Sequence, residues 1–139
     1  MCINKLLKKY KEPSTKEITA YKLVETFNFG SGYGTPYQHS VICPDVWMRA
    51  DRKQINAYDG QLYMTGFHVL KTRRGAEALK AEVSNGARYL IVKVRVRRIT
   101  YEGTDGTCDG AGLTRNVKNL VAHEMMISSK ELEKAVSRG

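Results

Sequence analysis

The segment Tyr89–Tyr101 constrains the fold more than any other part of this 139-residue chain. Inside it, apolar and cationic side chains alternate: Val92, Lys93, Val94, Arg95, Val96 and Arg97. A repeat of two residues places successive side chains on opposite faces of a β-strand. The pattern therefore predicts a strand with one buried face and one cationic face, within a sheet that covers the core on one side.

Weaker patterns of the same kind predict further strands over 20–29, 41–48, 62–70 and 120–127. Apolar residues at helical spacing predict a short amphipathic helix over 3–10. Thr72 is a suitable N-cap for a helix that runs to Ser84, and Ser128 with Glu131 resembles the capping box of a terminal helix. We expect an α+β fold, namely a mainly antiparallel sheet with one central helix and short terminal helices.

The length fits a single domain over 1–139, with a basic N-terminal arm over 1–16, a core over 20–127 and a C-terminal helix over 128–139. No apolar run approaches the roughly 18 residues of a membrane span, and the first residues lack the apolar stretch of a secretory signal. The three cysteines form no CxxC pair. This usage fits the reducing cytoplasm better than a disulfide scaffold or a zinc site.

The chain carries 23 Lys and Arg against 14 Asp and Glu, a net charge of +9 that attracts polyanions. Five lysines fall in the first sixteen residues, and we interpret them as a solvated, partly helical arm. The row formed by Lys93, Arg95 and Arg97 has two interpretations. It is the solvated face of a half-covered sheet, or it lines an oligomer seam or an anion-binding surface. An acidic neighbouring strand or a bound polyanion would relieve the repulsion within the row.

Catalytic and metal-binding motifs are missing from the sequence. The segment beginning His123-Glu124 lacks the second histidine of a zinc-protease motif, because Ile127 stands in its place. No phosphate-binding P-loop and no nucleophile elbow occurs. Cys43 near His39 is either a nucleophile or a half-buried structural thiol. We therefore expect no catalytic residues, no metal site and no cofactor.

Two glycine-rich segments are candidates for ligand contact. Gly30–Gly34 stands among aromatic residues, so it is either a phosphate cradle beside stacking side chains or a plain turn. A long loop is expected over 102–118, where Asp105 can accept from ribose hydroxyls. At its end, Arg115 offers donors to phosphate and Asn116 can bind a base or ribose edge.

Several short motifs, taken in order along residues 20–127, resemble a known family. They are Ala20–Val24, Tyr33–Gln38, Gly66–Thr72, Val92–Val94 and Val121–Met125. The series is similar to the anti-Thoeris sponge family of phages and prophages, the first-described type of Thoeris anti-defence protein. Members of that family sequester a cyclic ADP-ribose isomer made by a bacterial defence system and do not degrade it. Some also bind cyclic oligonucleotides, and the proteins are oligomeric.

The resemblance implies a protein of the host cytoplasm that blocks Thoeris immunity as a homo-oligomer, a dimer or larger assembly up to a hexamer. It implies neither an enzyme nor a membrane protein. A pocket for such a ligand needs an aromatic side chain for adenine and arginine for pyrophosphate. The residues that match by type and place are Tyr33, Phe67, Asp105, Arg115 and Asn116. The alternative for Phe67 is a core residue of its strand.

Two other functions remain open at this point. The net charge and the basic strand suit a nucleic-acid-binding accessory protein of phage origin. A nucleotide pocket also suits an enzyme such as an ADP-ribosyl transferase or a nucleotide hydrolase, in which His123 and Glu124 would be the residues to test.

Overall fold

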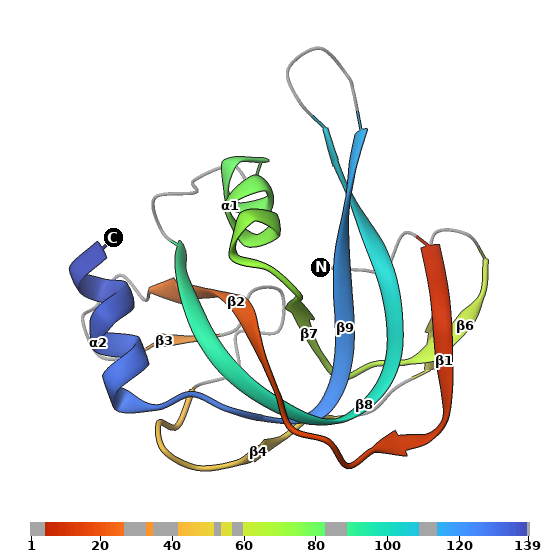
Figure 1. Cartoon of the computed structure of the whole chain (residues 1–139), viewed down its shortest axis with the longest axis horizontal. Helices are drawn as coiled ribbons and strands as arrows, with labels where there is room; N and C mark the ends of the chain where they lie inside the picture. The colour runs from red at the N-terminus through yellow and green to blue at the C-terminus, as the bar shows by residue number, and fades with distance from the viewer. Residues whose placement is uncertain are drawn as a thin grey trace.

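A computed structural model of the chain shows an α+β fold in which a strongly bent antiparallel sheet is packed between two helices (Figure 1). The structure describes residues 5–26, 33–34, 42–51, 54–56, 60–82, 89–108 and 114–138. The main sheet contains β1 (Lys5–Ser14), β2 (Ile18–Thr26), β3 (Tyr33–Gly34), β4 (Met48–Arg49), β7 (Phe67–Leu70), β8 (Tyr89–Cys108) and β9 (Thr114–Met126). A small second sheet pairs β5 (Gln54–Asn56) with β6 (Leu62–Met64), and the helices are α1 (Arg73–Glu82) and α2 (Ser129–Arg138).

The long strand β8 organises the sheet. β1 and β2 lie end to end along one edge of β8, so that Lys5 pairs with Thr104 and Glu25 pairs with Tyr89. The other edge of β8 pairs with β9, which in turn pairs with β7. Because β7 also pairs with β2, the strands β2, β8, β9 and β7 form a closed circuit. This closure wraps the sheet around a single interior.

The bend of β8 lies at Arg98, whose φ of 56° is in the left-handed region. Close by, the pairing with β9 shifts register between Ile99 and Tyr101. Such irregularities sharpen the twist of a strand and let a sheet curl. They also reverse the local alternation, because Val96 and Ile99 both belong to the main core although they are three residues apart.

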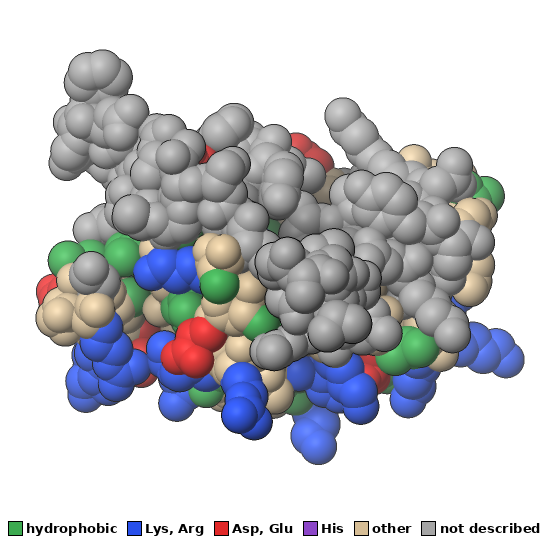
Figure 2. Space-filling model, turned by 90° about the horizontal axis from the view of Figure 1, so that it is seen from above, with side chains coloured by type: hydrophobic (Ala, Val, Ile, Leu, Met, Phe, Trp, Pro, Cys, Tyr) green, Lys and Arg blue, Asp and Glu red, His purple; other side chains and the backbone are tan. Residues whose placement is uncertain are grey.

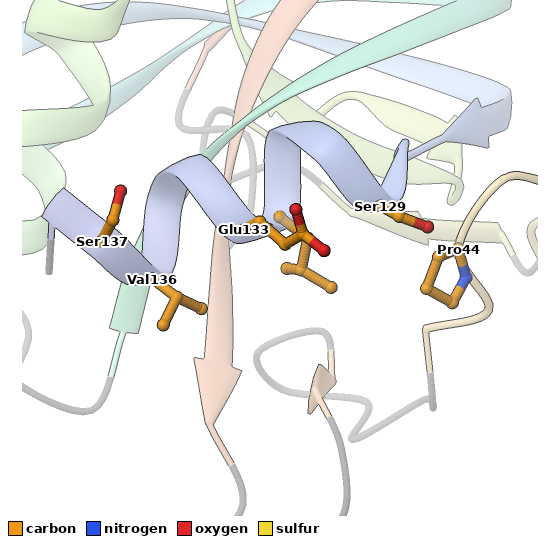
Figure 3. A pocket seen from close by; sticks show the side chains of 6 residues that line it. Pro44, Ser129, Glu133, Val136 and Ser137 are labelled. Atoms are coloured by element: carbon orange, nitrogen blue, oxygen red, sulfur yellow. The ribbon is translucent and has the colours of Figure 1, made fainter.

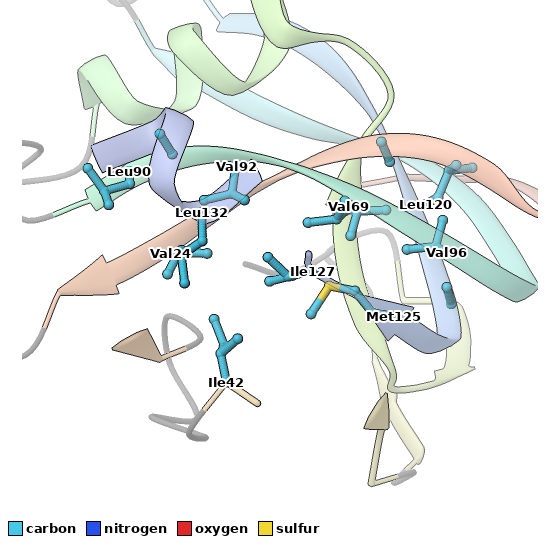
Figure 4. Close-up of a cluster of buried hydrophobic side chains, with 14 of the residues drawn as sticks. Val24, Ile42, Val69, Leu90, Val92, Val96, Leu120, Met125, Ile127 and Leu132 are labelled. Atoms are coloured by element: carbon cyan, nitrogen blue, oxygen red, sulfur yellow. The ribbon is translucent and has the colours of Figure 1, made fainter. Parts of the chain in front are cut away.

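The main core occupies the interior of the curled sheet (Figure 4). It contains the alternating valines of β8 together with residues from β2, β7, β9 and α2, including Val24, Val69, Leu120, Leu132 and Ala135. On the outer face, α1 packs Ala76 and Leu79 against Leu23 and Leu70, which are the sequence neighbours of inward-facing residues. The alternation predicted for β8 is confirmed, because its valines are buried while Lys93 and Arg95 are exposed on the outer face, which α1 covers in part.

Both predicted helix starts are confirmed by hydrogen bonds. The Gly75 amide donates to Thr72 Oγ1 at 3.0 Å, and the Glu131 amide donates to Ser128 Oγ at 3.1 Å. Asp45 adds a second cap to α2, because its carboxylate accepts from the amide and hydroxyl of Ser129. Neither α1 nor α2 is long and apolar enough to cross a membrane, and the described part of the chain has no other helix of that kind.

The predicted N-terminal helix is wrong where the structure describes it, because residues 5–14 form the strand β1. The helical spacing of Leu6, Leu7 and Tyr10 is a local signal, and pairing with residues 99–104 of β8 overrides it. β1 stands at one end of the strand order and carries exposed lysines and Pro13. Lysine and proline are common on edge strands because they discourage pairing with other chains.

The predicted loop over 102–118 is also wrong. β8 continues to Cys108 and β9 begins at Thr114, so most of this segment is a β-hairpin. Its glycines occupy strand positions: Gly103 pairs with Asn119, and Gly106 pairs with Asn116. Pairing with β9 at both glycines, and with β1 as well at Gly103, outweighs the low strand propensity of glycine.

Two predicted strands are shorter than expected. The strand over 62–70 is divided between the two sheets, as β6 and β7, by Thr65 and Gly66. A Cβ at Gly66 would lie 2.6 Å from the carbonyl oxygen of Ala122, so only glycine fits this close approach. Of the described residues 42–48, only Met48 is in a strand, because Pro44 and the cap formed by Asp45 interrupt the segment.

Candidate anion-binding site

A pocket of about 400 Å³ opens between the start of α1 and the base of the β8–β9 hairpin. Its lining residues come from α1, the segment before it and β9: Lys71, Thr72, Arg74, Gly75, Ala78, Val117 and Lys118. Three of these described residues are cationic and none is acidic. The pocket is therefore suited to a ligand that carries negative charge and has some apolar surface.

Gly75 lies where α1 packs closely on β9. A Cβ at this position would lie 3.2 Å from Thr72 Oγ1 and 3.5 Å from the Cβ of Val117. The approach to Val117 leaves room for a methyl group in ordinary contact, whereas the approach to the N-cap hydroxyl of Thr72 is tight. The Lys71 amide also donates to the Lys118 carbonyl at 3.1 Å, which ties the end of β7 to β9. The backbone therefore fixes the basic residues of the pocket relative to one another.

The start of α1 adds to the positive potential. Its first turn reads Arg-Arg-Gly-Ala and so contains no acidic residue. Unpaired amides at a helix start carry a partial positive charge and commonly bind phosphate. The Arg73 guanidinium lies 5.1 Å from the centre of the Tyr21 ring, and this residue is not part of the pocket lining.

One of the three cations of the pocket is already paired. Lys71 Nζ lies 2.9 Å from Glu102 Oε1, and both side chains are partly exposed. Arg74 and Lys118 form no ion pair with any residue that the structure describes. Arginine can hold a phosphate through two parallel hydrogen bonds, whereas lysine acts as a point charge. Arg74 and Lys118 are thus the groups available to an anion.

The predicted site residues Asp105, Arg115 and Asn116 lie in the hairpin beside this pocket. Asp105 pairs with Val117, which lines the pocket, and Arg115 and Asn116 directly precede Val117 in β9. Their side chains lie outside the described part of the structure. Their strand positions place the three in one hairpin.

The other two predicted residues lie elsewhere. Phe67 pairs with Ala122, seven residues along β9 from Arg115, which corresponds to roughly 20 Å. It is half-buried and packs against the main core, which agrees with the alternative interpretation as a core residue. Tyr33 pairs with Thr26 at the end of β2, and its side chain is not described. Residues 30–32 of the Gly30–Gly34 segment lie outside the described residues, as does His39.

The basic row of β8 has the acidic neighbours that would relieve its repulsion. Arg95 forms an ion pair with Glu17. The buried carboxylate of Glu124 on β9 binds Arg97 at 2.8 Å and Arg98 at 3.0 Å. Burial would raise the pKa of Glu124, but these arginines outweigh it and lower that pKa below its usual value. Glu124 is therefore a charged anchor for two arginines.

A part-buried polar network joins Tyr63 of β6 to His68 of β7. The Tyr63 hydroxyl and His68 Nε2 are 3.1 Å apart, and His68 Nδ1 is 3.2 Å from the Gly66 carbonyl oxygen. Burial and the nearby charge of Lys22 lower the pKa of His68 to about 3. The imidazole is thus neutral near pH 7, and its ring nitrogens are engaged in structural contacts.

A second pocket, of about 360 Å³, lies along α2 (Figure 3). Its lining is mainly apolar and includes Pro44, Leu132 and Val136, and its one charged residue is the carboxylate of Glu133. These features do not suit an anion. Among the described residues, no group of three or more His, Cys, Asp or Glu side chains could hold a metal ion.

The basic residues of the pocket were not predicted from the sequence. A signal was present, because Lys71, Arg73 and Arg74 surround the N-cap Thr72. Lys118 could be linked to them only through the pairing of β7 with β9. Comparisons with protein-family models, with curated proteins and with solved structures found no match for this chain.

Proposed function

We propose that the protein binds and sequesters a phosphate-bearing nucleotide signal of the cyclic ADP-ribose type in the pocket at the start of α1. The observation that carries the proposal is the placement of Arg74 and Lys118, without described acidic partners, beside a helix start. Asp105, Arg115 and Asn116 would complete the site from the hairpin. The volume of about 400 Å³ is within the range of small-molecule sites.

Sequestration rather than cleavage is the favoured mode of action. The cations of the described lining can bind phosphate groups. The described lining contains no carboxylate or histidine that could act as a general base. Tight binding by an abundant protein lowers the concentration of a free signal without any reaction. On this proposal the protein acts in the cytoplasm of an infected host, as a homo-oligomer, and blocks Thoeris immunity.

The test uses a cyclic ADP-ribose isomer incubated with an excess of the protein. We expect the nucleotide to disappear from a protein-free filtrate and to return intact when the protein is heat-denatured. Binding should also raise the melting temperature, since the ligand stabilises the folded state by mass action. A cleaved product after heating would contradict sequestration.

Two variants locate the site. Arg74→Ala removes the guanidinium of the pocket that has no ion pair among the described residues, and should weaken binding by about tenfold or more, the effect of losing one charge-assisted contact. Arg138→Ala, at the exposed end of α2, removes the same charge away from the pocket and should bind like the natural protein. Equal binding by all three proteins would place the site elsewhere.

A further inference from the structure

The outer face of β8 presents a set of cations that the proposed nucleotide site does not use. We call Lys93, Arg95, Arg97 and Arg98 the basic strip. Lys93 is exposed, and the side chains of Arg95 and Arg98 are more than half exposed. Figure 2 shows Lys and Arg side chains gathered along one rim of the molecule, the lower one in the view, with few acidic residues between them.

Positive charge remains in excess after the local ion pairs are formed. The four cations of the basic strip contact two carboxylates, those of Glu17 and Glu124. Lys93 has no ion pair within the described part of the chain. β1 continues along the same edge of β8 as β2 and adds three exposed lysines: Lys8, Lys9 and Lys11. The field along this edge of the sheet is therefore positive.

Two arginines of the basic strip are held in place. Glu124 binds both Arg97 and Arg98, which the left-handed φ of Arg98 allows although they are neighbours in sequence. The Arg97 guanidinium also lies 3.9 Å from the centre of the Trp47 ring. A guanidinium oriented in advance loses less conformational entropy when it binds an anion.

Two aromatic residues near the basic strip already have cationic partners. The Arg97 guanidinium lies over the Trp47 ring, and the Arg73 guanidinium lies over the Tyr21 ring. Tyr21 also packs against the cluster beneath α1. Proteins that bind single strands use free aromatic faces to stack the bases. The side chains of this face favour contact with a phosphate backbone instead. Lys93 and Arg97 are four residues apart, about 13 Å, which spans roughly four phosphates of one strand of a duplex.

We propose that the basic strip binds the phosphate backbone of double-stranded nucleic acid without reading its sequence. The strip shares no residue with the pocket at the start of α1. Double-stranded nucleic acid is thus a second type of ligand, and its binding does not depend on the proposed nucleotide site.

Fluorescence anisotropy with a labelled duplex of about 20 base pairs tests this proposal, at salt concentrations from about 50 to 200 mM. The natural protein should bind, with an affinity that falls steeply as salt rises. Lys93→Gln combined with Arg95→Gln should weaken binding at least tenfold at low salt. It should also reduce the slope of log affinity against log salt by about two, at roughly 0.9 for each phosphate that is no longer neutralised. Circular dichroism checks that the variant is folded.

The matched control is Lys130→Gln combined with Lys134→Gln. It removes the same charge from α2, which packs on the opposite face of β8. This control should bind the duplex like the natural protein. An equal loss in both variants would show attraction by net charge alone and would overturn the proposal, as would the absence of binding at low salt.

Three further measurements complete the test. A single strand that binds more tightly than the duplex would contradict backbone recognition of a double helix. Polyglutamate that displaces the duplex at an equal concentration of charge would point to an acidic protein partner instead and would also overturn it. Arg74→Ala should retain full duplex binding, so failure of the nucleotide proposal and failure of this one are distinguishable.

Discussion

Lys22 is a buried lysine at the point where two strands of the closed circuit separate. β2 and β7 share only the pair Tyr21–Leu70. Beyond that pair, Lys22 Nζ donates to the His68 carbonyl oxygen at 2.8 Å and thereby takes the place of a missing backbone bond. The residue is 6% exposed, and burial lowers the pKa of its ammonium from 10.5 to about 8. No described carboxylate forms an ion pair with it.

The size of this pKa change sets the expected effect of Lys22→Met. The difference between 10.5 in the unfolded chain and about 8 in the folded protein corresponds to about 3 kcal/mol. This is the cost of burying the charge at pH 7, where both states are protonated. Methionine removes that cost but leaves the His68 carbonyl without a donor, which costs about 1–2 kcal/mol. We therefore expect Lys22→Met to raise the free energy of unfolding by about 1–2 kcal/mol at pH 7.

The dependence on pH gives an independent check. Between pH 8 and pH 10.5 the unfolded chain holds a proton on Lys22 that the folded protein has released. The free energy of unfolding of the natural protein should therefore rise with pH across this interval, by up to about 3 kcal/mol from this residue. Lys22→Met should lack this part of the rise.

Urea unfolding at pH 7 and pH 10 measures both effects. Lys130→Met is the control, since it replaces an exposed lysine on α2 and should leave stability and its pH dependence nearly unchanged. If Lys22→Met is less stable than the natural protein at pH 7, or retains its full rise with pH, the reasoning is refuted.

Three more changes test the structure. His68 stays neutral in the folded protein, whereas the unfolded chain takes up a proton as the pH falls. The free energy of unfolding should therefore fall by about 2 kcal/mol between pH 6.5 and pH 5. His68→Gln should remove this part of the fall, which urea titrations at the two pH values measure. Gly66→Ala places a Cβ against the Ala122 carbonyl and should lower the free energy of unfolding by more than about 2 kcal/mol. Gly60 has a φ of 86° and open space around it, so Gly60→Ala should lower the free energy of unfolding by only about 1 kcal/mol in the same assay. Thr72→Ala removes the cap of α1 and should lower stability by about 1 kcal/mol, measured by thermal unfolding, and an unchanged melting temperature would contradict the capping role.

The parts of the fold that were predictable are those with signals inside one segment. The alternation from Val92 to Arg97 identified a two-sided strand, and Thr72 and Ser128 marked the starts of both helices. Such signals depend on backbone periodicity and capping, which act over a few residues. They account for the α+β class and for the antiparallel sheet.

The errors occurred where distant pairing decides the local structure. Residues 5–14 become a strand because β8 offers an edge about ninety residues later in the chain. Gly103 and Gly106 are drawn into strands by β9 for the same reason. The candidate site followed this pattern: the predicted Arg115 and Asn116 lie beside the pocket, but the link between Arg74 and Lys118 exists only through the packing of α1 on β9. The ligand contacts of the five predicted residues stay a prediction.

Because β1 pairs with the far half of β8, β1 stays unpaired for part of the time in which the chain is synthesised. At about 5–20 residues per second, a ribosome needs roughly 5–20 s to extend the chain from Ser14 to Cys108. During that interval β1 has no partner strand. Its lysines and Pro13 can then act as a temporary safeguard, because charge and proline keep an unpaired strand from joining a neighbouring nascent chain. The N-terminal lysines would thus protect the chain before folding as well as after it.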